Sequence, residues 1–170
     1  MAFPAYIAIK GTKQGQFKGE TEAAERKDKW MEIVAFTMEL DAPRNLATGQ
    51  PSGKRQYKPI TIVKEWGAAS PQILQACATD EVLTEVTIEF AQASTSGMRI
   101  AQTVKLTNAS IAAVARFIGS PEGAEDTATA GHSKANDRQE YERVSFTFQK
   151  IEVSDVAGKT TFGDDWVART

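Results

Sequence analysis

The residues best suited to covalent or metal chemistry are few and far apart in this sequence. The 170 residues contain one histidine, His132, and one cysteine, Cys77. A hydrolytic triad needs a base in a fixed position, and His132 lies in a polar stretch that offers none. Structural zinc sites need several cysteine or histidine ligands at short spacing. We therefore expect no catalytic residue, no metal site and no cofactor, and we predict that the chain is not an enzyme.

Two further motifs could carry chemistry, but neither fits the pattern that its chemistry requires. Gly158-Lys159-Thr160 matches the end of a phosphate-binding loop, but that loop needs a glycine where Val153 stands. Glu85 and Glu89 could form an acid and base couple, but their alternation fits the solvent-facing side of a strand better. The search for chemistry thus favours a binding or building element.

Composition narrows the class of protein. The chain is 41% hydrophobic and 25% charged, which is typical of a globular protein, and its length predicts one domain over residues 1–170. The net charge of −2 gives no support for a nucleic-acid partner or a membrane surface. The sequence starts without the basic segment and apolar run of a secretory leader, which predicts synthesis in the cytoplasm without a signal peptide. Its apolar runs are strand-sized, so we expect no membrane insertion.

Hydrophobic alternation predicts a chain built mainly of strands. We expect strands over 3–10, 30–40 and 59–66, a hairpin over 86–106 with its turn at 94–97, a third antiparallel strand over 111–117, and strands from 140 to 162 with a crossover near 149–150. One short helix should begin at Ser70-Pro71, with Ser70 as its cap and Ile73, Leu74 and Cys77 on its apolar stripe. The predicted fold class is all-β with one short helix, an antiparallel closed β-barrel flanked by that helix.

Two long loops interrupt the pattern. Residues 43–58 form a basic loop with four cations and no carboxylate, and a loop of this length favours a functional role. Residues 119–138 are small and polar, which predicts a mobile, exposed loop.

The sequence resembles the Hcp (haemolysin-coregulated protein) family of bacterial type VI secretion systems in several stretches that follow one another in the family's order. These stretches are Met1-Ala2-Phe3, Tyr6-Ile7-Ala8-Ile9, GKRQYKPITIVKEW over 53–66, ASPQILQA over 69–76, VSFTFQKI over 144–151 and GDDW over 163–166. The resemblance covers nearly the whole chain but leaves out residues 119–138.

The resemblance implies a hexameric ring whose copies stack into the inner tube of a contractile secretion machine. It further implies that the tube carries or chaperones small effectors, is expelled through the machine, and contacts sheath, baseplate and spike proteins. The alternative reading is a monomeric β-barrel that carries a small apolar ligand, although the many large apolar residues at inward positions favour a filled interior. A fused enzymatic domain has no stretch of sequence left to encode it.

A ring and a stack both need complementary surfaces, and opposite charges cluster in two segments of this chain. We hypothesise that cations of the basic loop meet acids of residues 152–165 between subunits or rings, so charge reversal at Arg55 should weaken assembly. The residues predicted for these contacts are Arg44, Lys54, Arg55, Lys58, Glu152, Asp155, Asp164 and Asp165.

The pore of such a ring must be lined by outward-facing strand residues, because side chains fill the interior of each barrel. The lumen candidates are the polar members of the predicted hairpin: Glu85, Thr87, Glu89, Thr103 and Lys105.

Overall fold

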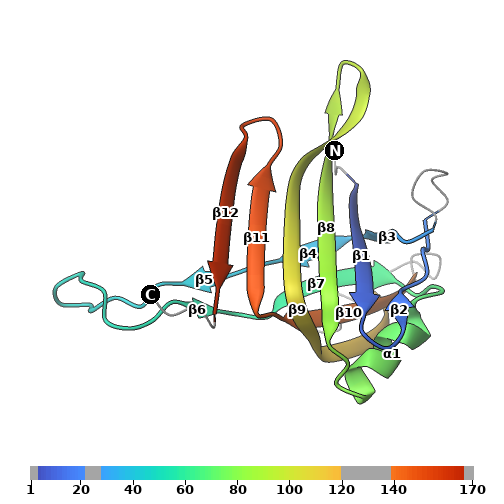
Figure 1. The fold of residues 1–170 in the computed structure, drawn as a ribbon, viewed down its shortest axis with the longest axis horizontal. Coiled ribbons are helices and arrows are strands. Elements are labelled where there is room, and N and C mark those ends of the chain that lie inside the picture. Colours follow the sequence, from blue (N-terminus) through green and yellow to red (C-terminus); the bar gives the residue numbers. More distant parts are fainter. Residues whose placement is uncertain (1–3, 22–27, 120–138, 167–170) are drawn as a thin grey trace.

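The computed structural model describes residues 4–21, 28–119 and 139–166, and these are mostly β-strand with one short helix (Figure 1). The elements are β1 (Ala5–Gly11), β2 (Gly15–Gln16), β3 (Met31–Ile33), β4 (Ala35–Thr37), β5 (Leu40–Asp41), β6 (Gln56–Tyr57), β7 (Ile60–Glu65), α1 (Ser70–Ala78), β8 (Leu83–Ser94), β9 (Gly97–Gly119), β10 (Gln139–Thr147), β11 (Lys150–Asp155) and β12 (Thr160–Asp165).

The strands form two layers that share β9. In the front layer of Figure 1, the first half of β9 pairs with β8 and β11, β1 pairs with β8, and β12 pairs with β11. We call this layer the front sheet. Behind it, the second half of β9 pairs with β10, β10 with β7, and β7 with β4. We call this layer the back sheet.

A bend in β9 carries the chain from the front sheet to the back sheet. Asn108 lies at this bend with a left-handed φ of 50°, and its side-chain amide donates to Gln149 Oε1 at 2.9 Å. The segment predicted as a separate third strand is therefore the second half of β9, and the prediction of three sequential antiparallel strands was wrong. Asparagine tolerates the left-handed conformation better than most residues, which lets the strand change direction without ending.

The predicted strand over 30–40 is divided at Val34, because its two halves have different partners. β3 pairs with β1 of the front sheet, whereas β4 pairs with β7 of the back sheet. The backbone N–H of Val34 donates to the carbonyl of Val63 at 2.8 Å, at the junction between the halves. This segment therefore borders both sheets.

The inward faces of the two sheets enclose the hydrophobic core. Each apolar side chain of this size stabilises the fold by about 1.5–3 kcal/mol when it leaves water. The front sheet contributes Ile7, Ile9, Val86, Ile88 and Leu106, and the back sheet contributes Ile60, Ile62, Val144 and Phe146. The alternation that predicts the hairpin places Val86, Ile88, Val104 and Leu106 on one face, and all four are buried.

The helix lies where the sequence predicts it, but two of its details differ. Pro71 occupies the first turn, while the N-cap position falls on Ala69 and no side chain caps the helix. The predicted cap was wrong because Ser70 uses its hydroxyl elsewhere. Ile73 is buried as expected, whereas Leu74 is 39% exposed and Ala76 takes its place on the buried face. Cys77 is half-buried against the core.

The C-terminal strands confirm the predicted crossover. β10 belongs to the back sheet, and the chain passes through Phe148 and Gln149 into β11 of the front sheet. β11 then turns back into β12. The predicted loop over 119–138, with His132, lies outside the described residues apart from Gly119, the last residue of β9. Within the described part of the chain, no helix is long and apolar enough to cross a membrane.

Candidate functional site

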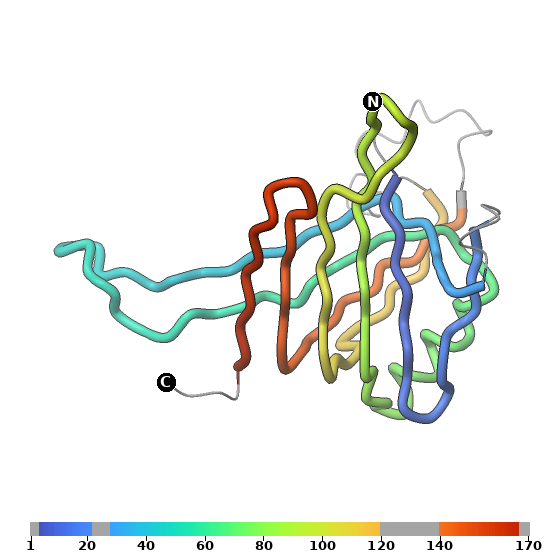
Figure 2. Tube along the Cα trace, turned by 45° about the horizontal axis from the view of Figure 1, so that its top comes forward, coloured from blue at the N-terminus to red at the C-terminus, as the bar shows by residue number. Residues whose placement is uncertain are grey.

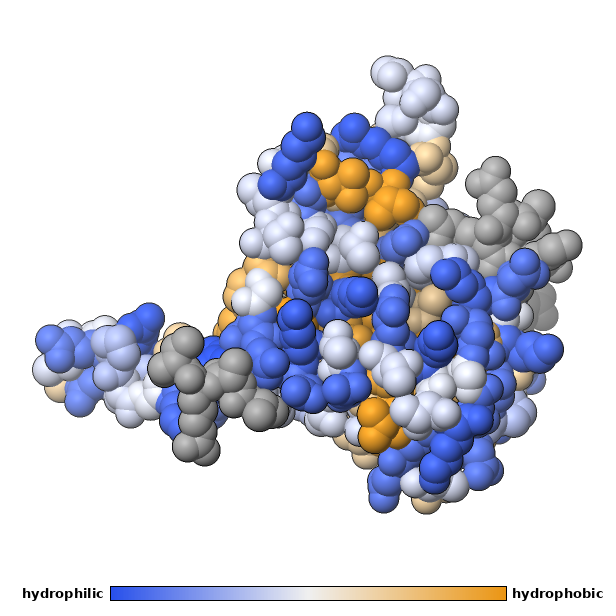
Figure 3. Space-filling model, in the orientation of Figure 1, coloured by the Kyte–Doolittle hydropathy of each residue, from blue (hydrophilic) through white to orange (hydrophobic). Residues whose placement is uncertain are grey.

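The outward face of the front sheet is polar across its strands. Its registers place Thr87 opposite Lys105 and Glu89 opposite Thr103. Lys105 in turn lies opposite Glu152. The space-filling view of this face is mostly hydrophilic, with apolar patches mainly toward its upper edge (Figure 3). The inward neighbours of these residues are buried, so the polarity follows from the period of two along each strand.

The five lumen candidates all lie on this face. Glu85 and Lys105 are exposed, and the hydroxyl of Thr87 donates to Glu85 Oε1 at 3.1 Å. Thr87, Glu89 and Thr103 are half-buried. The structure thus brings the candidates together on one surface, and their position in a lumen stays a prediction.

The basic loop forms a long projection, which we call the arm and define as residues 42–55 between β5 and β6. β5 and β6 pair at its base, and Arg44 and Pro51 form an isolated bridge further out. The arm extends away from the sheets on the side of β12 (Figures 1 and 2). The predicted loop over 43–58 is therefore an extended arm with paired strands at its base.

The tip of the arm is an ordered turn built by Asn45. Its side-chain oxygen accepts from the backbone N–H groups of Ala47 and Thr48 at 2.8 and 3.2 Å. Its carbonyl accepts from Gly49 N at 2.7 Å, and Gly49 has the positive φ of 71° that glycine adopts without strain. This turn holds Leu46 fully exposed at the end of the arm.

Arg55 and Tyr57 fix the base of the arm to the end of β12. Arg55 forms a two-pronged ion pair with Asp164, and the phenol of Tyr57 donates to the same carboxylate at 2.5 Å. Hydrogen bonding from Arg55, followed by that from Tyr57, lowers the pKa of Asp164 below its ordinary value. Burial, followed by the Asp164 contact, raises the pKa of Tyr57 to about 12.

An aromatic cluster packs beside this ion pair. The ring of Tyr57 meets Phe148 edge-on at 5.2 Å between centroids, and Trp166 stacks on Phe148 at 5.7 Å. Trp166 also lies 5.6 Å from Tyr57. The arm is therefore attached to the front sheet by both charge and packing.

The predicted contact residues separate into two groups. At the base, Lys58 pairs with Glu39 at 2.6 Å, and Arg55 pairs with Asp164 inside one chain. Arg44, at the bridge to Pro51, and Lys54, next to Arg55, are exposed and form no ion pair with any described residue. Contacts between subunits stay a prediction.

The predicted acids also have places within the chain. Asp155 accepts from Gly158 N at 2.7 Å and from the Gln102 amide at 3.2 Å. The backbone carbonyl of Asp165 accepts from Arg55 at 3.1 Å. Glu152 is half-buried on the polar face. The structure therefore brings the arm and these acids together at the contact of Arg55 with the carboxylate of Asp164 and the carbonyl of Asp165.

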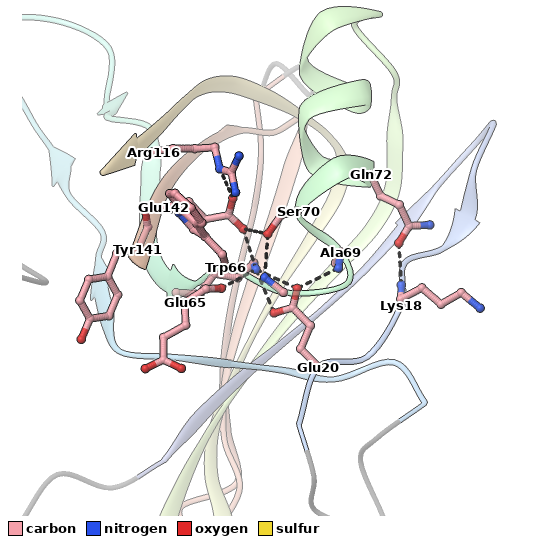
Figure 4. Close-up of polar contacts among 12 residues, drawn as sticks. Lys18, Glu20, Glu65, Trp66, Ala69, Ser70, Gln72, Arg116, Tyr141 and Glu142 are labelled. Carbon is pink, nitrogen blue, oxygen red and sulfur yellow. Dashed lines mark hydrogen bonds and ion pairs between the residues drawn. The ribbon is translucent and has the colours of Figure 1, made fainter. Parts of the chain in front are cut away.

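Sequence reasoning missed a buried ion network between the back sheet and α1 (Figure 4). The ammonium of Lys64 is fully buried and lies 2.6 Å from Glu142 Oε1 and 2.9 Å from both oxygens of Glu20. The hydroxyl of Ser70 donates to Glu142 Oε1 at 2.8 Å, and Ala69 N donates to Glu20 Oε1 at 2.8 Å. The network thus ties the start of α1 to β7 and β10.

A cation stacked on an aromatic ring borders this network. The guanidinium of Arg116 lies 3.9 Å from the centroid of Trp66, and its Nε lies 3.8 Å from Glu142 Oε2. The indole N–H of Trp66 donates to the Tyr141 carbonyl at 2.7 Å. The sequence held one signal for this network: Lys64 continues the inward alternation of Ile60 and Ile62.

The described residues contain no cluster of three metal-ligating side chains. The exposed features that could contact other molecules are the polar face of the front sheet, the arm and the edge strand β12. These features define the class as a mostly β protein with a polar sheet face and a projecting arm.

A family match and a similar protein both place this chain in one family. Residues 6–154 match the family described as "Type VI secretion system effector, Hcp". The chain is 32% identical to "Major exported protein" of Pseudomonas aeruginosa, over 98% of this chain and 96% of that protein. The chain therefore belongs to the Hcp family of type VI secretion proteins.

Solved structures share the fold. The chain superposes on a structure described as "Crystal structure of Hcp protein" with a TM-score of 0.82 and 26% identity, covering 97% of this chain and all of that one. It superposes on "Secreted protein Hcp3 from Pseudomonas aeruginosa" with a TM-score of 0.73 and 27% identity, covering 98% of this chain and all of that one. The expected family resemblance is confirmed.

Proposed function

We propose that this chain is a tube subunit of a type VI secretion system, which forms hexameric rings that stack into an expelled inner tube. The observation that carries the proposal is the continuous polar face of the front sheet on a chain whose length matches the Hcp family almost throughout. A polar face of this kind suits the wall of a water-filled lumen, because it holds cargo by modest contacts and releases it.

In the assembled ring, the front sheet faces the lumen with Glu85, Thr87, Glu89, Thr103 and Lys105. The proposal includes closure of the two sheets into a barrel. The segment that borders both sheets supports it, since β3 pairs with β1 and β4 pairs with β7. Large buried side chains such as Phe17 and Phe146 fill the space between the sheets, which argues against the rival reading of a carrier with an internal ligand.

The partners of the tube follow from the same proposal. Copies of the chain contact one another, and the tube contacts sheath, baseplate and spike proteins and small effectors. The protein leaves the cell through the secretion machine, which agrees with the names "Major exported protein" and "Secreted protein Hcp3" of two similar proteins.

Light scattering coupled to size-exclusion chromatography of the purified chain tests this proposal. We expect a mass six times that of the 18.5 kDa chain, and ring-shaped particles in electron micrographs. A particle of 18.5 kDa at every protein concentration, with a melting temperature that rises when apolar ligands are added, would favour the monomeric carrier.

The lumen assignment needs its own test. Replacing Thr87 and Thr103 by tryptophan should leave the ring mass unchanged and reduce co-purification of a small effector. A matched double variant carries tryptophan at Leu74 and Gln75 on the exposed side of α1, and it should retain the effector. If both variants retain the effector equally, the result contradicts the assignment of the front sheet to the lumen.

A further inference from the structure

A small hollow lies on the outward face of the front sheet, where β1 and β8 run side by side (Figure 1). Its volume is about 370 Å³, and its floor contains Ala8 and Thr87, which lie opposite each other in the register. Ala8 stands between the longer Tyr6 and Lys10 on this face, so its short side chain leaves a depression in the sheet. Trp30 also lines the hollow, and both Ala8 and Trp30 are buried. The polar face therefore contains a recess with a partly apolar floor.

The charges around this hollow are separated by sign. Lys10 of β1 and Lys29, which precedes β3, supply two cations, whereas Glu85 and Glu89 of β8 supply two carboxylates. Lys10 lies opposite Glu85 in the register, but no ion pair joins either lysine to a described residue. The rim is thus neutral in sum, with its cations on one side and its carboxylates on the other.

Neighbouring side chains hold two of these charges in place. The ammonium of Lys29 lies 5.4 Å from the centroid of the Trp30 ring, within the range of a cation–π contact. The hydroxyl of Thr87 donates to Glu85 Oε1 at 3.1 Å. A rim that is already ordered loses little conformational freedom when a ligand binds. Charges beside a buried floor also interact through less water, which strengthens their contacts.

The spacing of the two charged sides fits an extended polypeptide. Neighbouring strands lie about 4.7–4.9 Å apart, and residues i and i+2 of an extended chain lie about 6.5 Å apart on one face. The long lysine and glutamate side chains lean outward over this difference. A segment that crosses the strands can therefore set an acidic side chain against the lysines and a basic one against the glutamates. A segment with two like charges would meet repulsion on one side.

We propose that this hollow binds an extended segment of cargo polypeptide that carries an acidic and a basic side chain two residues apart. The acidic side chain lies at Lys10 and Lys29, the basic one lies at Glu85 and Glu89, and the backbone of the segment covers the floor. This inference rests on the proposed function, because it places the hollow in the lumen of the tube. It adds the chemistry by which the lumen recognises its cargo.

A single hollow of this kind binds weakly, which suits a tube that must release what it carries. Ion pairs at an exposed rim contribute little each. Repetition of the hollow around a ring raises the retention of a cargo that engages several copies at once, without a tight single site. Because the rim is neutral in sum, retention depends on the pairing of charges along the cargo segment rather than on its net charge.

Saturation-transfer NMR with short peptides tests the hollow on the purified wild-type chain. The probe is the acetylated and amidated pentapeptide Ala-Asp-Ala-Lys-Ala, and the like-charge comparisons are Ala-Lys-Ala-Lys-Ala and Ala-Asp-Ala-Asp-Ala. We expect the mixed peptide to bind with a dissociation constant about fivefold or more below that of either comparison. Equal binding of the three peptides would overturn the inference.

Charge reversal locates the binding on the surface. In Lys10→Glu/Lys29→Glu all four rim charges are negative, so the mixed peptide should bind about fivefold more weakly and the dilysine peptide more tightly than with the wild type. Both lysines are exposed, so the fold should be kept. The matched control Lys105→Glu/Lys150→Glu reverses two exposed lysines of the front sheet outside the hollow, with the same change in net charge. It should bind the mixed peptide as the wild type does, and an equal loss in both variants would contradict the assignment to the hollow.

Peptide binding is read without reference to assembly, so the outcomes separate this inference from the proposed function. A ring of six chains that does not bind the mixed peptide contradicts the cargo hollow and leaves the tube proposal standing. A particle of 18.5 kDa that binds this peptide supports the hollow and contradicts the stable ring. A chain that neither assembles nor binds the peptide contradicts both.

Discussion

Arg55 and Asp164 lie 109 residues apart in the sequence and form a two-pronged ion pair at the base of the arm. Tyr57 adds a third hydrogen bond to the same carboxylate. One aspartate on the edge strand β12 therefore holds both Arg55 of the arm and Tyr57 of β6, and it attaches the base of the arm to the front sheet.

Removing this carboxylate should loosen the arm without unfolding the sheets. In Asp164→Asn, hydrogen exchange of the amides in β5 and β6 should accelerate about tenfold, because a charge-assisted contact is lost. Exchange in β8 should not change. Asp155→Asn, at the opposite end of β11, serves as the matched control and should leave β5 and β6 as they are. Unchanged exchange in Asp164→Asn would show that the aromatic cluster alone holds the arm.

Acid should weaken the same contact. The pKa of Asp164 is lowered in the folded chain, so folding favours the ionised form. Its contribution is fully present above the unfolded pKa of about 3.9 and is lost as the pH falls through the folded value. The difference in free energy of unfolding between wild type and Asp164→Asn should therefore shrink between about pH 5 and pH 3. Denaturant titrations at both pH values measure it, and an equal difference at both would contradict the role of this carboxylate.

The buried lysine should be far more sensitive than the exposed ones. Lys64→Met removes the buried cation that lies closest to Glu142, and breaking a buried ion pair in this way typically costs about 3–5 kcal/mol. The double variant Lys64→Met/Glu142→Leu should regain a large part of that loss, because neither charge is then buried alone. Chemical denaturation measures both proteins. Lys105→Met on the exposed polar face should leave the free energy of unfolding nearly unchanged, and a similarly small effect at Lys64 would contradict the network.

The bend of β9 should depend on the conformation of Asn108. Asn108→Val forces a β-branched residue into the left-handed region and should cost about 1–3 kcal/mol. Asn108→Gly adopts the same conformation freely and, like the valine variant, lacks the amide contact to Gln149. If Asn108→Gly lowers the free energy of unfolding by less than about 1 kcal/mol, the larger cost of Asn108→Val comes from the backbone conformation. Equal losses in the two variants would assign the cost to the amide contact instead.

The sequence by itself determined the local structure of this protein. Alternation at Val86, Ile88 and Phe90 predicted a strand with one buried face, and Ser70-Pro71 marked the start of the helix, because side-chain period and proline geometry act within a few residues. The resemblance of residues 53–66 and 144–151 also pointed to the family, since these stretches keep both residue types and spacing.

The tertiary structure alone decided which residues meet. The sequence grouped Arg55 with the acids of residues 152–165 and placed the pairs between subunits, but the fold brings Asp164 to Arg55 within one chain. Lys64 continues the inward alternation of Ile60 and Ile62, but only the fold brings Glu20 and Glu142 to its ammonium group. Asn108 bends one strand across both sheets, where alternation indicated two strands. Each of these depends on contacts between distant segments, and neither side-chain period nor local charge encodes their distances.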